Sequence, residues 1–128
     1  MNKGTILIAD DEKDIIEMLE KKLRQNDFQV LAFSNGKDAL DGCRRFRPDL
    51  VLMDIAMPDM DGYSVGLALR EDADLKRTPI IFMTAKELEY SGIEKRLSEI
   101  ANCDFVTKPC SLEDLLSKIK AAKGGRHV

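Results

Sequence analysis

Leu50-Val51-Leu52-Met53-Asp54 is the stretch that decides the fold of this 128-residue chain. Its four apolar residues show no helical period, which is typical of a strand buried on both faces. The run ends on a carboxylate, and residues 55–62 then supply the proline, aspartates and glycine of a turn. Open α/β sheets carry their working groups at the carboxyl ends of such strands, so Asp54 is a candidate functional residue. The alternative is that Asp54 only caps the next segment.

Four other apolar runs flank this stretch, and segments of helical pattern separate them. The helical segments place apolar residues three or four positions apart, as in the stripe of Ile15, Leu19 and Leu23. We expect strands over residues 5–9, 28–33, 50–54, 79–83 and 105–107, and helices over 14–25, 35–46 and 63–71, within 87–101, and from 111 onward. Five strand–helix units in strict alternation predict an α/β fold with parallel strands and helices on both faces of the sheet.

Polar residues suited to capping mark the expected helix ends. Ser34 is the expected N-cap of the second helix, and Ser111 forms a capping box with Asp114 at the last one. Asn102 is a candidate left-handed stop after the fourth helix.

Length and composition predict a single cytoplasmic domain. We expect residues 1–123 to form it and residues 124–128 to be a flexible C-terminal tail. With 44% hydrophobic and 34% charged residues the chain is globular, and a net charge of −3 does not indicate nucleic-acid binding. No apolar run approaches the roughly 18 residues of a membrane span. The N-terminus lacks the flanks of a signal peptide, and the three cysteines lack metal-ligand spacing, so we expect reduced thiols.

Polar groups end four of the five expected strands: Asp10 and Asp11 the first, Asp54 the third, Thr84 the fourth and Lys108 the fifth. Because the carboxyl ends of parallel strands meet at one edge, these groups are expected close together. Two carboxylates about 4 Å apart repel by about 4 kcal/mol at an effective dielectric near 20. A cation with hard oxygen ligands relieves this repulsion, and Mg²⁺ suits a site with few protein ligands and room for water and phosphate.

This set of residues, in this order, resembles the receiver domain of response regulators in two-component signalling, of the chemotaxis-regulator type. The resemblance spans about residues 3–120 and is carried by Asp10-Asp11, Asp54, Met57-Pro58, Asp61-Gly62, Thr84-Ala85, Phe105 and Lys108-Pro109. It implies a doubly wound, flavodoxin-like (βα)5 sheet with strand order 2-1-3-4-5.

The resemblance also implies a role for each residue. Asp54 is the implied phosphoacceptor for a sensor histidine kinase or a histidine phosphotransfer protein, with Lys108 and Thr84 binding phosphoryl oxygens. The implied Mg²⁺ ligands are Asp11, Asp54, the main-chain carbonyl of Ala56 and, through a water, Asp10. Such a domain catalyses only its own phosphoryl transfer and dephosphorylation, so it is a signalling domain and not an enzyme acting on an outside substrate.

A conformational switch is the implied output. Thr84 would move toward the phosphate and Phe105 into the vacated space, reshaping the face made by the fourth helix, fifth strand and fifth helix. That face would then control partner binding, homodimer formation or a separate output domain, and whether the chain acts alone or within a longer regulator stays open. The family more often has Tyr at position 105, and Ala56 and Lys86 stand where it tunes the phosphate lifetime.

Each residue taken alone has a structural alternative. Asp11 could be a helix N-cap, Thr84 a β-branched strand residue, and Lys108 a solvated side chain. Phe105 could be a core residue.

Two other function classes compete with the receiver interpretation. An aspartyl-phosphate phosphatase of similar sheet type has an acid two residues after its nucleophile, where this chain has Ala56. A binding module that has lost phosphorylation would lack Asp54, Asp11 or Lys108, and all three are present. Residues 59–62 superficially resemble a calcium loop but lack its later ligands.

Overall fold

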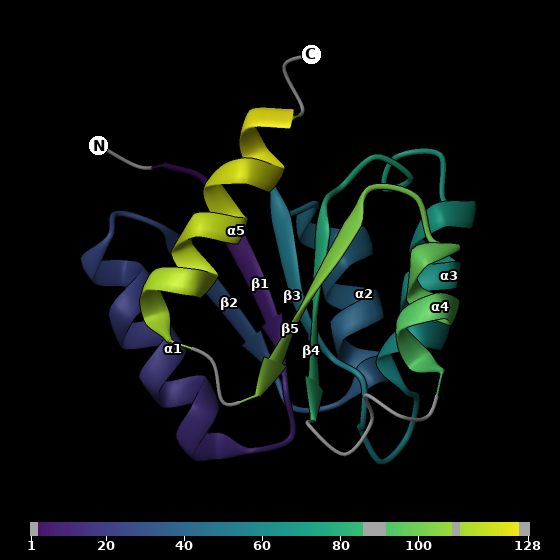
Figure 1. Ribbon diagram of the computed structural model, residues 1–128, viewed down its shortest axis with the longest axis horizontal. Coiled ribbons are helices and arrows are strands. Elements are labelled where there is room, and N and C mark those ends of the chain that lie inside the picture. Colours follow the sequence, from purple (N-terminus) through teal and green to yellow (C-terminus); the bar gives the residue numbers. More distant parts are fainter. Residues whose placement is uncertain (1–2, 86–91, 109–110, 126–128) are drawn as a thin grey trace.

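The structure is a computed structural model that describes residues 3–85, 92–108 and 111–125. In these ranges strands and helices alternate along the chain, as the sequence predicts (Figure 1). The elements are β1 (Thr5–Ala9), α1 (Lys13–Gln25), β2 (Gln29–Phe33), α2 (Gly36–Phe46), β3 (Leu50–Asp54), α3 (Gly62–Glu71), β4 (Ile80–Ala85), α4 (Ile93–Ser98), β5 (Cys103–Lys108) and α5 (Leu112–Gly125).

The strands form one parallel sheet in the order β2-β1-β3-β4-β5, which confirms the predicted topology. Their carboxyl ends all lie at the lower edge of the sheet in Figure 1. In the register of the sheet Asp54 lies beside Met83, and Ala85 lies beside Lys108. The ends of β1, β3, β4 and β5 therefore meet at one edge.

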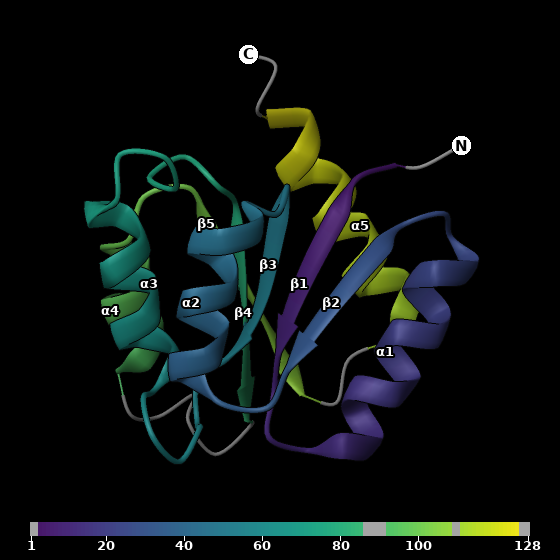
Figure 2. The same ribbon diagram turned by 180° about the vertical axis from the view of Figure 1, so that it is seen from behind.

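Two apolar cores hold helices on the two faces of the sheet (Figures 1 and 2). Alternate strand residues point to opposite faces, so Leu7 and Val51 join the core under α2, α3 and α4, whereas Ile6 and Leu52 join the core under α1 and α5. All five residues of β3 are buried, as its unbroken apolar run predicts. Within the described ranges, no helix has the length and apolar character needed to cross a lipid bilayer.

The buried stripe of α1 differs from the expected one by a single residue. Ile16 is buried together with Leu19 and Leu23, whereas Ile15 is only half-buried. Spacings of three and four residues both fall on one helix face, so the two adjacent isoleucines fit the stripe almost equally well and packing on the sheet chooses between them.

The N-cap of α2 is Asn35, so the expectation of Ser34 was wrong. The Asn35 side chain accepts a hydrogen bond from the backbone N–H of Asp38 at 2.8 Å. Both residue types cap helices well, and Asn35 holds the extended backbone conformation that an N-cap requires.

The last two helices agree with the sequence in part. Residues 87–91 of the segment expected to hold the fourth helix lie outside the described residues, as does Lys86 before them, and α4 covers Ile93–Ser98. The expected bond from the N–H of Asp114 to the Ser111 hydroxyl is present at 3.0 Å, which confirms Ser111 as the N-cap of α5 and gives one of the two bonds of the predicted capping box. α5 runs through Gly125 and includes the first two residues of the segment expected to be a tail. Glycine costs a helix only about 1 kcal/mol relative to Ala, so the last turn continues.

Arg70, at the end of α3, ties together the loops at the amino end of the sheet. Its guanidinium donates hydrogen bonds to four main-chain carbonyls, those of Leu75, Thr78, Ala101 and Asn102, at 3.1, 2.8, 2.6 and 3.1 Å. Asn102 has a φ of 56°, so it adopts the expected left-handed conformation, three residues beyond the C-cap of α4. We call this group the Arg70 clamp.

Candidate functional site

The ammonium of Lys108 is the centre of the polar cluster at the carboxyl edge of the sheet. Its Nζ lies 2.6 Å from Asp10 Oδ2, 3.4 Å from Asp54 Oδ2 and 3.6 Å from Glu12 Oε1. Burial alone lowers the pKa of Lys108, but its hydrogen bond to Asp10 and the carboxylates around it outweigh burial and raise that pKa. Three strands, β1, β3 and β5, thus place one cation between two buried acids.

Asp54 is the most perturbed carboxyl of the cluster. Its side chain is 8% exposed, and its Oδ1 accepts a hydrogen bond from the N–H of Ala56 at 3.3 Å. Burial raises the pKa of Asp54 from its ordinary value of 3.8 to about 6, the charge of Asp10 adds to this effect, and Lys108 opposes it. A carboxyl with this pKa is ionised at neutral pH but held in an unfavourable environment, as is typical of functional groups.

We expect the free energy of unfolding to fall as the pH rises from about 4 to about 6, with Asp54 as a cause. The pKa of Asp54 is higher in the folded than in the unfolded chain, so the folded chain binds more protons in this window and deprotonation favours unfolding. The shift corresponds to at most about 3 kcal/mol, and solvent at the sheet edge reduces this to about 1–2 kcal/mol.

Urea unfolding without divalent cations, at pH values of about 4 and about 7, measures this slope in the wild type and in Asp54→Asn. The variant should lose the Asp54 contribution and gain about 1–2 kcal/mol at the higher pH only. The same change between the two pH values in both proteins would contradict the assignment.

The other acids of the edge form a second, overlapping group. Carboxylate oxygens of Asp10, Asp11 and Glu12 all lie within 4.8 Å of one another, with Asp10 buried and the other two exposed. Asp10 Oδ1 also accepts from the N–H of Glu12 at 2.9 Å. Asp11 therefore lies beside Asp10 and Glu12, and the ammonium of Lys108 lies 3.4 Å from Asp54.

Glu12 is a site residue that the sequence analysis missed. It is the N-cap of α1 but makes no side-chain cap hydrogen bond, and its carboxylate lies near Lys108 instead. The only sequence feature that points to Glu12 is its position directly after Asp10 and Asp11. That position is equally typical of an acidic residue that favours the start of a helix.

Thr84 lies on β4 and Phe105 lies on β5, which pairs with β4. Thr84 is buried, and its hydroxyl donates a hydrogen bond to the carbonyl of Val106 at 3.3 Å. Phe105 is half-buried and packs against the core under α2, α3 and α4. Thr84 is thus bonded to the residue that follows Phe105, while Pro109, the last residue of the expected motif, lies outside the described residues.

The donor set at this edge fits a hard divalent cation. Carboxylate oxygens of Asp10, Asp11 and Glu12 converge, and the described residues near them bring no thiolate or imidazole. Oxygen-only donors in a solvent-open cluster suit Mg²⁺ and do not suit zinc.

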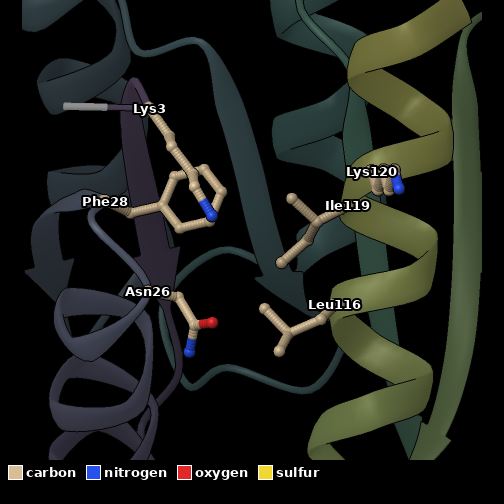
Figure 3. Close-up of a pocket in the computed structure, with 6 residues that line it drawn as sticks. All are labelled: Lys3, Asn26, Phe28, Leu116, Ile119 and Lys120. Atoms are coloured by element: carbon tan, nitrogen blue, oxygen red, sulfur yellow. The ribbon is translucent and has the colours of Figure 1, made fainter. Parts of the chain in front are cut away.

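The described residues also form a groove of about 470 Å³ at the opposite end of the sheet (Figure 3). Figure 3 shows Phe28, the residue directly before β2, facing Leu116 and Ile119 of α5. Lys3 Nζ lies 5.9 Å from the centroid of the Phe28 ring. Because Lys3 and Phe28 precede β1 and β2, whereas Lys108 is at the carboxyl end of β5, the groove is separate from the Lys108 cluster.

The model of the response regulator receiver domain family matches residues 6–120 of this chain. The chain belongs to this family. Receiver domains are the phosphoacceptor signalling domains of two-component systems, and they interact with histidine kinases or phosphotransfer proteins.

Solved receiver structures support this membership. The signal receiver domain of a signal transduction histidine kinase from Syntrophus aciditrophicus is 34% identical, with a TM-score of 0.86 and coverage of 95% of this chain and 91% of that chain. A receiver domain of a Francisella response regulator is 27% identical, with a TM-score of 0.84 and coverage of 97% and 99%. The receiver domain of a sensor histidine kinase from Pseudomonas aeruginosa PAO1 is 28% identical, with a TM-score of 0.85 and coverage of 94% and 98%, and has a magnesium ion coordinated in its active-site cleft.

Proposed function

We propose that Asp54 is the phosphoacceptor of this receiver domain and that it works with Mg²⁺. The observation that carries the proposal is the position of Lys108, whose ammonium lies within 3.4 Å of both Asp10 and Asp54. A phosphoryl group carries negative charge during its transfer, so a cation is needed beside the attacking carboxylate. Lys108 supplies this cation from β5.

The reaction is a displacement at phosphorus. An oxygen of the Asp54 carboxylate forms the new bond, the bond from phosphorus to the donor's histidine nitrogen breaks, and that nitrogen keeps the electron pair and takes up a proton. The pKa of about 6 leaves Asp54 ionised at neutral pH, which is the nucleophilic form. Lys108 and Thr84 are the proposed ligands of the phosphoryl oxygens, so Thr84 must give up its bond to Val106.

The proposed magnesium ligands are Asp11, Asp54 and the main-chain carbonyl of Ala56, with Asp10 acting through a water. When bound, Mg²⁺ would supply positive charge to the carboxylates and the phosphoryl oxygens. The magnesium ion in the Pseudomonas receiver domain supports this assignment, as does the convergence of Asp10, Asp11 and Glu12.

The proposed readout is a change in the face formed by α4, β5 and α5. A shift from 1:99 to 99:1 between two states requires about 5.5 kcal/mol, and each charge-assisted hydrogen bond contributes about 1.5–3 kcal/mol. New bonds from Lys108 and Thr84 to the phosphoryl group supply most of this difference. Phe105 would then enter the space left by Thr84, and the altered face would bind a partner or a second copy of the chain.

Incubation with a small phosphodonor and Mg²⁺, followed by intact-mass measurement, tests the proposed function. We expect one added phosphoryl group that is lost at alkaline pH, as an acyl phosphate is. Absence of any adduct, under conditions that label another receiver domain, would exclude the proposal.

We expect Mg²⁺ to stabilise the fold through Asp11. A ligand at a hundred times its dissociation constant adds about 2.7 kcal/mol to the free energy of unfolding. Asp11→Ala should lose most of this gain, whereas Asp14→Ala, which removes the same charge from the exposed first turn of α1, should keep it. Urea unfolding with Mg²⁺ and with a chelator measures the gain, and an equal gain in both variants would argue against Asp11 as a ligand.

A further inference from the structure

Asp59 lies in the loop of residues 55–61, which follows the proposed phosphoacceptor, and its carboxylate binds the amino end of α2. Its Oδ1 accepts the N–H of Gly36 at 2.9 Å, and its Oδ2 accepts the N–H of Lys37 at 3.0 Å. These are the first two N–H groups of α2, which have no partner within the helix. The Asn35 side chain caps only the N–H of Asp38. Asp59 therefore caps the two remaining N–H groups, although it is 22 residues from Lys37 in the sequence.

The loop also lies directly on the backbone of α2. A Cβ on Gly36 would lie 2.1 Å from the carbonyl oxygen of Met60, so this approach requires glycine. At the other end of the loop, the N–H of Gly62 donates to the carbonyl of Ile55 at 2.9 Å, and a Cβ on Gly62 would lie 2.2 Å from the carbonyl oxygen of Asp54. The loop of residues 55–61 is therefore fixed at two places.

Ala56 lies between these two fixed places. It is exposed, while its neighbours Ile55 and Met57 are buried, and its N–H donates to Asp54 Oδ1. The helix to which Asp59 attaches the loop packs on β1, because Ala39 and Cys43 share a core with Leu7 and Ala9. β1 leads into Asp10, so α2 gives the loop and the acidic pair a common support.

We propose that Asp59 is a positioning residue for Mg²⁺ binding and phosphoryl transfer. By clamping residues 55–61 to α2 it fixes Ala56 relative to Asp54 and to the acids after β1. The inference rests on the proposed function, because it assigns to the Ala56 backbone a part in the metal site. Desolvation raises the pKa of Asp59, but backbone hydrogen bonds, chiefly those from Lys37 and Gly36, together outweigh it and lower that pKa, so Asp59 is a carboxylate at neutral pH.

Three variants test the role of the hydrogen bonds between Asp59 and α2. Asp59→Ala removes both acceptors, Asp59→Asn keeps one acceptor and loses the charge, and Asp38→Ala removes the same charge from the same end of α2 without touching the loop. Amide hydrogen exchange at Gly36 and Lys37, Mg²⁺ affinity by calorimetry, and the rate of phosphorylation by a small phosphodonor are measured for each.

We expect Asp59→Ala to speed exchange at both amides and to weaken Mg²⁺ binding by about 10-fold, as loss of a supporting hydrogen bond does at other metal sites. Asp59→Asn should be intermediate and Asp38→Ala unchanged in Mg²⁺ affinity. If Asp38→Ala weakens Mg²⁺ binding as much as Asp59→Ala, the effect is one of charge, and the positioning role of Asp59 is excluded. Faster exchange with unchanged Mg²⁺ affinity would leave Asp59 a simple helix cap and overturn the inference.

Gly36→Ala gives an independent test, because it keeps the carboxylate but forces the loop away from α2. It should weaken Mg²⁺ binding in the same direction, and the double variant with Asp59→Ala should be little worse than either single one. If Gly36→Ala does not fold, the Asp59 pair decides alone. A wild-type chain that binds Mg²⁺ but takes up no phosphoryl group would exclude the proposed function. Amide exchange and Mg²⁺ affinity would still show whether Asp59 positions the loop for Mg²⁺ binding.

Discussion

Asp54→Asn should take up no phosphoryl group from a small phosphodonor under conditions that label the wild type fully. The amide has nearly the shape of the carboxylate but lacks the charged oxygen that forms the bond to phosphorus. Loss of a nucleophile lowers enzymatic rates by far more than loss of one hydrogen bond, so we expect a decrease of at least about 10³-fold. Intact-mass measurement after timed incubation gives both rates.

The variant should also remain folded, which makes the result interpretable. The pairs of Lys108 with Asp10 and Glu12 do not involve Asp54, and removal of a buried charge relieves repulsion with Asp10. Asp14→Asn, a change on the exposed first turn of α1, should label at the wild-type rate. Equal labelling of Asp54→Asn and the wild type would remove Asp54 from the reaction.

Lys108→Ala should be the most destabilising change at the site. It leaves Asp10, which is fully buried, without its 2.6 Å partner, and it leaves Asp54 without the cation that opposes its raised pKa. Breaking a buried ion pair costs about 3–5 kcal/mol, and the open edge of the sheet reduces the expected loss to about 2–3 kcal/mol. Urea unfolding measures it at neutral pH without divalent cations.

Lys118→Ala is the matched control for stability. Lys118 pairs with Asp104 at 3.1 Å, but both side chains are substantially exposed, so its loss should cost less than about 1 kcal/mol. Equal losses in the two lysine variants would show that Asp10 does not depend on Lys108.

The Lys108→Ala protein also tests the switch. It should still accept a phosphoryl group, more slowly, but the change in amide exchange along β4 and β5 that follows phosphorylation should disappear. An unchanged exchange response would exclude Lys108 from the conformational step.

The sequence predicted the sheet well because each strand is a short, separate apolar run. β1 and β3 begin and end where their patterns do, and strict alternation with helices leaves the parallel arrangement as the natural solution. The sequence could not predict which of two adjacent residues is buried in a helix stripe or caps a helix. Ile16 rather than Ile15, and Asn35 rather than Ser34, are selected by packing and by backbone direction, which composition does not record.

The site was predictable to a similar extent. Placing Asp10, Asp54 and Lys108 at one edge needed only strand ends and parallel geometry, and the structure brings their charged atoms together. The approach of Glu12 to Lys108 could not be predicted, because it depends on how the backbone turns into α1. The bond from Asp59 to α2 was also hidden, because it joins segments more than 20 residues apart whose local patterns are complete without it.

The Arg70 clamp joins two connections of the chain at the end of the sheet opposite the Lys108 cluster. It fastens the chain between α4 and β5 to the α3–β4 connection, far from the carboxyl edge where Lys108 lies. In the switch proposed above, these bonds would hold the carboxyl end of α4 in place, so that its amino end would move most. A protein that recognised this helix would then respond to its tilt rather than to a translation along the sheet.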